Sequence, residues 1–512
     1  MLVKTYGSAV YGVEAITITV ETNLSTGVKF FLVGLPDNAV KESEQRIGAA
    51  LRNNGFKVPG KKIVINMAPA DIRKEGSAYD LTLAMGILGA SGQVFADDLE
   101  KYMIMGELSL DGGLQPIRGA LPIAIQARKE GFKGFILPKQ NAKEAAIVSD
   151  LEVYGASNIR EVIDFFNGEG NLHPEVVDTR AEFSKEGNIY DVDFTDVKGQ
   201  ENVKRALEIA AAGGHNVILI GPPGVGKTML AKRIPTILPP LSLMEALETT
   251  KIHSVAGLMD SHSALITTRP FRNPHHTVSD VALVGGGTNP KPGEISLAHN
   301  GILFLDELPE FKRAVLEVLR QPMEDRKVTI SRARITVDYP ASFMLVASMN
   351  PSPSGDFYDP EKGTADSEMA VRRYLNKISG PLMDRIDLHI EVSPVPFDEL
   401  SNKAAGEGSA SIRQRVRVAR EIQTARYMDY PGIHSNAQLT PKLMKVYCEV
   451  DEAGNRLLKN AVERLGFSAR SYARILKVAR TIADLEASHS IQSRHVAEAI
   501  QYRSLDREGW LG

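Results

Sequence analysis

The residues from Gly221 to Thr228 have the types and the spacing of a loop that binds nucleotide phosphates. In order they are Gly221, Pro222, Pro223, Gly224, Val225, Gly226, Lys227 and Thr228, which fit the pattern G-x-x-x-x-G-K-[ST]. An apolar run, Val217 to Ile220, precedes the loop and a helical pattern follows it. Glycines let backbone N–H groups close around phosphates, Lys227 reaches the β- and γ-phosphates, and the Thr228 hydroxyl ligates Mg²⁺. The loop therefore predicts binding of ATP together with Mg²⁺.

A second apolar run, Ile302 to Leu305, ends in two carboxylates. As a buried strand it would deliver Asp306 to the metal and Glu307 to the position of a base that polarises the attacking water. A chance glycine-rich turn beside an unrelated acidic strand end is the alternative. It is disfavoured because the strand context that the chemistry requires occurs twice. The two motifs together indicate ATP hydrolysis.

Length and composition fit a large protein with several cores. The chain has 512 residues, 43% of them apolar, which suggests roughly three domains of usual size. The formal net charge of -3 gives no global attraction to nucleic acid or membrane. The only cysteine, Cys448, excludes an intramolecular disulfide and a cysteine-based metal cluster. The N-terminal residues lack the pattern of a leader and no apolar run has the length of a membrane span, which predicts a cytoplasmic location without membrane contact.

The pattern along the chain predicts an α/β fold with three parts. Residues 1–167 alternate short apolar runs (ITITV, KFFLV, KIVINMA, GFILP) with helical stretches such as Asp37 to Asn53. Residues 168–190 are polar and without periodicity, which favours a linker. Residues 191–395 alternate strands and helices around the phosphate loop, and residues 396–512 are helical. In this last part the expected helices are Ser411 to Arg426, Lys442 to Leu465, Ser468 to Ser488 and Ser493 to Arg503.

Further motifs carry a resemblance to a known family. FTDVKGQ before the loop, Asn350 at the end of FMLVAS, and GPLMDRIDL are similar to an AAA+ ATPase of the magnesium-chelatase-like branch. The whole chain resembles the YifB/ComM family through RPFRNPHHTVSD, GEISLAHNGILFLDELPEF, VTISRARITVDYPASF and SARSYARILKVARTIADL in that order. The resemblance implies an N-terminal domain like that of Lon peptidases, a central AAA+ core, a C-terminal helical lid and assembly into a hexameric ring.

The resemblance also implies roles for single residues. Asn350 would be the first sensor, which positions the attacking water; a strand-end Asn that only makes a turn is the alternative. Arg385 would be an arginine finger inserted into the neighbouring subunit's site, and a local salt bridge with Asp384 or Asp387 is its alternative. Either Arg470 or, one helical turn later, Arg474 would be the second sensor that contacts the nucleotide. The choice between these two stays open.

Contacts with DNA are expected from a β-hairpin that projects into the ring's channel. KVTISRARITVD, from Lys327 to Asp338, alternates polar and apolar residues and resembles the pre-sensor hairpin of ring helicases. Arg332 and Arg334 share one strand face, where they and Lys327 would track a phosphate backbone without reading bases. A solvated edge strand protected by charge is the alternative.

A second basic element precedes the acidic strand and has no assigned role. It comprises Arg269, Arg272, Lys291, His275 and His276. Two adjacent histidines point in different directions on most backbones, which argues against a metal site here.

The N-terminal domain is expected to lack peptidase chemistry. RKEGSAYDLTLA and GELSLDGGLQPIRGAL are similar to the two catalytic segments of Lon-type peptidases, which use a Ser and Lys dyad. Their nucleophile and lysine positions fall on Ala78 and Leu121, and Ser77 is displaced by one residue, which on a strand would turn it to the other face.

Many family members look cysteine-rich after Asn350. This chain has Pro351 to Gly355 there, so no zinc is expected.

Three functions therefore compete. The first is a hexameric DNA motor of helicase or branch-migration type, which the resemblance implies acts in recombination during natural transformation. The second is a chelatase-type motor that remodels a metal-inserting partner, but the acidic or metal-binding extension of such partners is absent. The third is an ATP-dependent unfoldase or peptidase, against which Ala78 and Leu121 argue. Arg332 and Arg334 favour the first.

Overall fold

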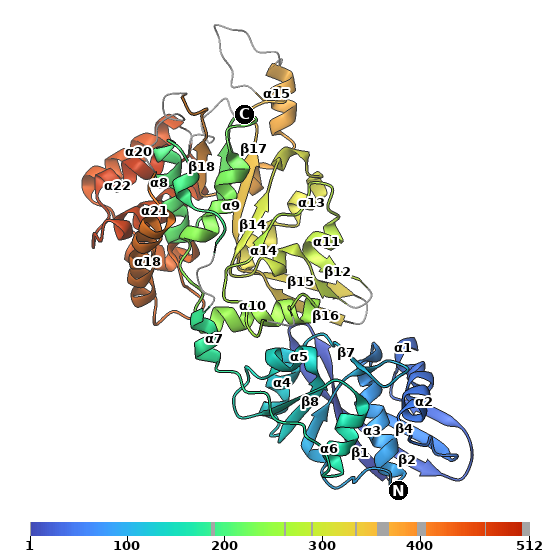
Figure 1. The fold of residues 1–512 in the computed structure, drawn as a ribbon. Helices are drawn as coiled ribbons and strands as arrows, with labels where there is room; N and C mark the ends of the chain where they lie inside the picture. The colour runs from blue at the N-terminus through green and yellow to red at the C-terminus, as the bar shows by residue number, and fades with distance from the viewer. Residues whose placement is uncertain are drawn as a thin grey trace.

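The computed structural model describes residues 2–185, 190–260, 263–287, 290–332, 335–355, 368–396, 406–465 and 467–503. Figure 1 shows an N-terminal α/β part at one end of the molecule, a central sheet with helices on its faces, and a C-terminal group of helices beside that sheet. The predicted α/β fold class is confirmed.

A seven-stranded mixed sheet forms the N-terminal part, in the order β3-β4-β2-β1-β5-β8-β9. Its strands are β1 (Leu2–Tyr11), β2 (Glu14–Ser25), β3 (Phe30–Val33), β4 (Lys62–Ala68), β5 (Tyr102–Ile104), β8 (Gly134–Pro138) and β9 (Glu152–Ala156). The helix α3 (Asp80–Ala90) is buried at every position, as its apolar sequence requires, and α4 (Ala120–Lys129) packs against β2. The four apolar runs expected to be strands lie in β2, β3, β4 and β8, which confirms them.

One local expectation in this part is wrong. The helix expected from Asp37 to Asn53 is divided at Glu42 into α1 (Asn38–Lys41) and α2 (Ser43–Asn53). The segment 168–190, predicted to be a linker, contains α7 (Thr179–Lys185). Its residues Leu172, Val177 and Phe183 pack against the N-terminal core. Tertiary burial thus orders a segment that has little periodicity of its own.

The central part is built on a five-stranded parallel sheet in the order β11-β14-β17-β10-β18. The strands are β11 (Phe271–Arg272), β14 (Ile302–Leu305), β17 (Met344–Met349), β10 (Val217–Ile220) and β18 (Leu388–Glu391). The helices around it are α8 (Glu201–Gly213), α9 (Lys227–Ile237), α10 (Leu243–Ala256), α13 (Arg313–Glu317), α14 (Arg320–Asp325) and α15 (Glu368–Leu375). Because all strands are parallel, the residues that follow β10, β14 and β17 meet at one edge.

The C-terminal helices share a core with the central part. They are α18 (Ser409–Arg426), α19 (Pro441–Tyr447), α20 (Glu452–Leu465), α21 (Ala469–Leu485) and α22 (Ser493–Gln501), and α18 and α21 pack against α8. The single helix expected from Lys442 to Leu465 is wrong, because the chain breaks between α19 and α20. At the break Val450 pairs with Ile491 in a parallel bridge, and Asp451 accepts a hydrogen bond from the Gly454 N–H.

Backbone and side-chain hydrogen bonds join the N-terminal part to the central part. Gly119 N–H donates to the Ser254 carbonyl on α10, and the Tyr11 hydroxyl donates to the Thr336 carbonyl at 3.0 Å. Among the described residues, none of the helices combines the length with the apolar character that crossing a bilayer would need.

Candidate nucleotide-hydrolysis site

The phosphate loop joins β10 to α9 at the carboxyl edge of the central sheet. A side chain at Gly221 would place its Cβ 2.2 Å from the Val392 carbonyl oxygen, so glycine is required by close backbone approach. Gly224 and Gly226 have φ of +82° and +93°, the left-handed region that favours glycine. Glycines at these positions therefore let the backbone of the loop take this shape.

Lys227 is held where the phosphates of a nucleotide would lie. Its ammonium donates to the carbonyls of Gly221 and Pro222 at 2.6 and 2.8 Å, and to Asn350 Oδ1 at 3.0 Å. Burial lowers the pKa of this amine, while Asp306 and Glu307 oppose that shift. A buried ammonium that is held by oxygen acceptors in this way is suited to bind the oxygens of a phosphate group.

Thr228 and Asp306 are joined across the sheet edge. The Thr228 hydroxyl donates to Asp306 Oδ2 at 2.8 Å. The other carboxylate oxygen accepts from the Ser348 hydroxyl, and this hydroxyl also accepts the Glu307 N–H at 3.2 Å. The hydroxyl and the carboxylate form an oxygen-rich donor set of the kind that Mg²⁺ prefers.

Ser348 was missed by sequence reasoning. It is the hydroxyl within the otherwise largely apolar, fully buried strand β17. A buried polar residue two positions before Asn350, the predicted first sensor, was the available signal, because residues two apart share one face of a strand.

Glu307 follows Asp306 with a backbone that is unusual for a residue with a side chain. Its φ is +54°, and its side chain is 62% exposed, so the carboxylate faces the solvent side of the site. His276 Nδ1 lies 3.8 Å from Glu307 Oε2. The expectation that His275 and His276 point apart is wrong, because their ring centroids lie 4.1 Å apart at an interplanar angle of 35°.

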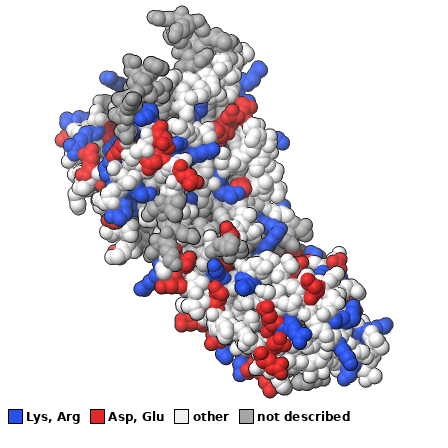
Figure 2. All heavy atoms as spheres, viewed as in Figure 1, with Lys and Arg blue, Asp and Glu red and all other residues white. Residues whose placement is uncertain are grey.

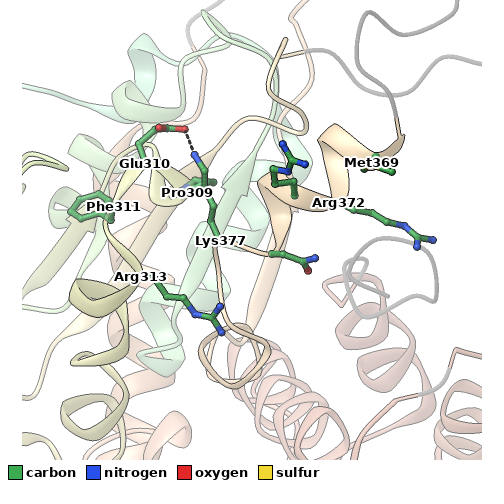
Figure 3. Close-up of a pocket in the computed structure, with 9 residues that line it drawn as sticks. Pro309, Glu310, Phe311, Arg313, Met369, Arg372 and Lys377 are labelled. Atoms are coloured by element: carbon green, nitrogen blue, oxygen red, sulfur yellow. Dashed lines mark hydrogen bonds and ion pairs between the residues drawn. The ribbon is translucent and has the colours of Figure 1, made fainter.

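A cavity of about 450 Å³ lies between Glu307 and Asn350 and is closed on one side by α15. The Tyr374 side chain of α15 is hydrogen-bonded to the Asn350 backbone, and burial raises the pKa of Tyr374 to about 12. A neighbouring pocket of about 660 Å³ is drawn in Figure 3, where Lys377 reaches Glu310 at 3.2 Å and Arg313 and Arg372 line the wall. Cationic side chains therefore line both pockets near Glu307 and Glu310.

The two arginines considered as the second sensor lie at the other edge of the sheet. Arg474 pairs with Asp387 at 3.0 Å, and the Asp387 N–H donates to the Asn216 carbonyl, which directly precedes β10. Arg470 pairs with Asp384 at 3.2 Å and is 62% exposed. The structure does not bring either residue to the Lys227 of its own chain.

Arg385 lies at this same amino edge. Its guanidinium pairs with Glu324 at 2.5 Å and its side chain is 8% exposed, so its partner is neither of the two aspartates considered from the sequence. Within the described residues, its Nε is a buried polar atom without a hydrogen bond. Arg385 therefore lies at the edge of the sheet opposite the phosphate loop of its own chain.

The expected hairpin is present as β15 (Lys327–Arg332) and β16 (Ile335–Pro340), paired antiparallel. Lys327 pairs with Asp338 at 2.7 Å, so a DNA phosphate would have to compete with that carboxylate. Arg332 is exposed near the end of β15, and Arg334 lies outside the described residues.

In the second basic element, Arg269 pairs with Glu245 at 3.2 Å and Arg272 with Glu294 at 2.6 Å. Both are engaged within the fold.

The N-terminal domain places the two positions of the missing dyad in non-reactive surroundings. Ala78 lies in a short 3₁₀ turn, Ser77–Tyr79, rather than on a strand, and Leu121 is fully buried in α4. The Ser77 hydroxyl donates to the Glu107 carboxylate. The acceptor of this hydrogen bond is a carboxylate and not a lysine amine, so Ser77 does not form the Ser and Lys dyad through it.

Sheet order, phosphate loop, acidic strand end and strand-end asparagine together define an AAA+ ATPase of the magnesium-chelatase type. Models described as "Magnesium chelatase, subunit ChlI", "Subunit ChlI of Mg-chelatase" and "Magnesium chelatase, subunit ChlI C-terminal" match residues 193–400, 20–141 and 406–503. The site chemistry of this class is nucleotide hydrolysis.

Within this class the chain belongs to the ComM/YifB family. It is 46% identical over 508 residues to the Competence protein ComM of Haemophilus influenzae, covering 98% of this chain and 97% of that protein. It is 44% identical over 503 residues to the protein YifB of Escherichia coli, covering 98% and 96%. A partial likeness to Lon protease 2 of Bacillus subtilis, 31% identical over 158 residues, covers 27% of this chain and 26% of that protein.

Proposed function

We propose that the chain is a subunit of an ATP-driven hexameric ring motor that acts on DNA, of helicase or branch-migration type, in recombination of incoming DNA. One observation carries the ring. The phosphate loop lies at the carboxyl edge of the sheet, while Arg385, a buried arginine with an unsatisfied Nε, lies at the amino edge. An arginine there completes a site only when it faces a second copy.

The residues of one subunit then divide the hydrolysis among them. Lys227 holds the phosphates, and Thr228 with Asp306 holds the Mg²⁺. Glu307 accepts the proton of the attacking water, and Asn350 orients that water. ATP with Mg²⁺ supplies the phosphoanhydride bond whose cleavage drives the motor. Such a motor works in the cytoplasm.

Contact with DNA is assigned to the hairpin for reasons of charge and position. Figure 2 shows basic and acidic residues interspersed over the face in view, so a polyanion must be bound by a local feature. Arg332 is exposed near the end of β15, and the arginines of the second basic element are engaged within the fold. The name of the relative in Haemophilus influenzae, a competence protein, supports a role connected with DNA uptake.

A chelatase-type motor is the second candidate. It is favoured by the three matching family models and by a 28% identity over 216 residues to the magnesium-chelatase 67 kDa subunit of Heliobacterium mobile. An ATP-dependent peptidase is disfavoured by Ala78, by Leu121 and by the Ser77 contact with Glu107.

One experiment separates these candidates. ATP turnover is measured with and without single-stranded DNA, alongside displacement of one strand from a forked duplex. A DNA motor gives DNA-stimulated turnover and strand displacement that both disappear in Glu307→Gln. Turnover that ignores DNA, with no strand displaced from any branched substrate, rejects the proposal. A casein-cleavage assay in the same buffer tests the peptidase alternative.

A further inference from the structure

A small polar cavity of about 120 Å³ lies far from the phosphate loop, at the amino edge of the central sheet. It is enclosed by the start of α10, the end of α14, and the helices α18 and α21. Its lining is rich in arginine: Arg269, Arg326, Arg420 and Arg474. The lining carboxylates are Glu245 and Asp387. The cations therefore outnumber the carboxylates at this site.

Both carboxylates are already used by other partners. Asp387 accepts from Arg474 through one oxygen at 3.0 Å and from the Asn216 N–H through the other at 2.9 Å. Glu245 accepts from Arg269 at 3.2 Å and from the Ser242 N–H at 2.7 Å. These pairs neutralise Arg269 and Arg474 and leave no carboxylate among the lining residues for Arg326 or Arg420.

Arg420 and Arg326 are the cations without a charged partner. Arg420 donates to the carbonyls of Ala211 and Ala212 at the end of α8, at 2.9 and 3.1 Å. Arg326 follows α14 with φ of +56°, and across the described residues its guanidinium makes no hydrogen bond or ion pair. A guanidinium has five N–H donors, and holding one partly buried without an acceptor costs free energy.

The surroundings disfavour the charged form of Arg326, Arg420 and the neighbouring Lys477. Burial lowers the pKa of Arg326 to about 10, and burial followed by the nearby Arg269 lowers that of Arg420 to about 10. Behind the lining, burial followed by Arg474 lowers the pKa of Lys477 to about 8. An anion in the cavity would relieve all three.

We infer that this cavity is a binding site for a phosphate-class dianion, separate from the ATP site, with Arg326 and Arg420 as its principal ligands. The cavity volume accommodates one phosphate group and not a nucleoside. Planar guanidinium groups recognise phosphate through paired N–H donors, which makes arginine the residue suited to this task. The source of the phosphate is either free inorganic phosphate or the terminal phosphate of a nucleotide that projects out of the cavity. This inference does not depend on the proposed DNA motor.

Calorimetric titration of inorganic phosphate into the full-length Lys227→Ala protein tests the site without interference from the phosphate loop. We expect one equivalent of phosphate to bind. Adding Arg326→Gln should weaken binding at least tenfold, because the free guanidinium is lost. Arg417→Gln is the matched control, since Arg417 lies on α18 with a 52% exposed side chain and pairs with Glu421 at 3.5 Å. Titration with ATP in place of phosphate distinguishes the two sources. If the site takes the terminal phosphate of a nucleotide, ATP competes with inorganic phosphate for it; if the site takes only free phosphate, ATP does not compete.

Thermal unfolding provides a second readout that a purely structural arginine would not produce. In phosphate-free buffer Arg326→Gln should unfold at a higher temperature than the parent, since a partly buried cation without a charged partner is removed. Phosphate should stabilise the parent and not the variant. The proposal is overturned if Lys227→Ala protein binds no phosphate, if Arg326→Gln leaves the affinity unchanged, or if that variant is equally destabilised with and without phosphate.

Discussion

The Lys227 ammonium donates a 3.0 Å hydrogen bond to Asn350 Oδ1, which joins the phosphate loop after β10 to the end of the neighbouring strand β17. The same amide residue is hydrogen-bonded through its backbone to Tyr374 of α15. A change in the contacts of Lys227 therefore has a direct route to α15, whose Arg373 and Tyr374 line the cavity beside Glu307.

Lys227→Ala should abolish nucleotide binding, whereas Glu307→Gln should retain binding and trap the ATP-loaded state. In the proposed mechanism the lysine contacts phosphate in every state, while the glutamate acts only on the attacking water. Equilibrium binding of a fluorescent ATP analogue and steady-state turnover measure the two effects. Glu310→Gln, which changes a carboxylate paired with Lys377, is the control and should keep turnover. Equal loss of ATP affinity in the Lys227 and Glu307 variants contradicts these roles.

Ser348→Ala should raise the Mg²⁺ concentration needed for half-maximal turnover and slow turnover roughly five- to thirtyfold. The substitution removes the hydroxyl that donates to Asp306 and accepts from the Glu307 N–H, and such bonds contribute about 1–2 kcal/mol. The measurement is a Mg²⁺ titration of ATP hydrolysis. Ser352→Ala, which removes a hydroxyl bonded to Ser354, serves as the control. An unchanged Mg²⁺ dependence in Ser348→Ala would show that this hydroxyl does not position the carboxylate.

Arg385→Ala should leave ATP affinity nearly intact and reduce turnover by roughly a thousandfold, the range expected for an arginine finger. Mixing it with Lys227→Ala protein should restore part of the activity, because each variant supplies the half-site that the other lacks. Arg320→Ala, which breaks the nearby pair with Glu317, is the control. Circular dichroism checks the fold, since Arg385 is also paired with Glu324. Absence of rescue in confirmed mixed rings argues against a shared site.

Changing Arg332 and Arg334 together to Ala should weaken DNA binding without regard to sequence and flatten its salt dependence. Fewer counterions are released when fewer phosphates are neutralised. Lys327→Ala should have the smaller effect, because Asp338 already neutralises that ammonium. Basal ATP hydrolysis should survive in both the double arginine variant and the Lys327→Ala variant. Normal unwinding with an unchanged salt slope would leave the hairpin as a solvated edge.

Acidification should destabilise the protein through His389, which is fully buried and has its pKa lowered well below the ordinary value. The unfolded chain takes up the proton at a higher pH than the folded one. The stabilisation is therefore complete above about pH 6.5 and falls as the pH drops below it, by at most about 1.4 kcal/mol per pH unit. Unfolding temperatures at pH 7.5, 6.5 and 5.5 measure this, with His389→Gln expected to flatten the slope. His489→Gln, at an exposed position, should leave it unchanged.

The ATP-site chemistry was readable from the sequence because it depends on local pattern. Glycine positions, a lysine and a hydroxyl at fixed spacing, and an acidic pair after an apolar run determine the phosphate loop and its metal carboxylate wherever strand and helix flank them. The Thr228 contact with Asp306 then required only that β10 and β14 lie in one parallel sheet.

The remaining arrangement was decided by packing between segments far apart in the chain. Ser348 reaches Asp306, His276 reaches Glu307, and Arg385 and Arg474 lie at the edge opposite Lys227. The helix break at Val450 and the packing of α7, which lies in a polar segment, also involve contacts with distant residues. Local spacing says which groups a chain possesses. Strand order and the burial of unlike charges determine which of them meet.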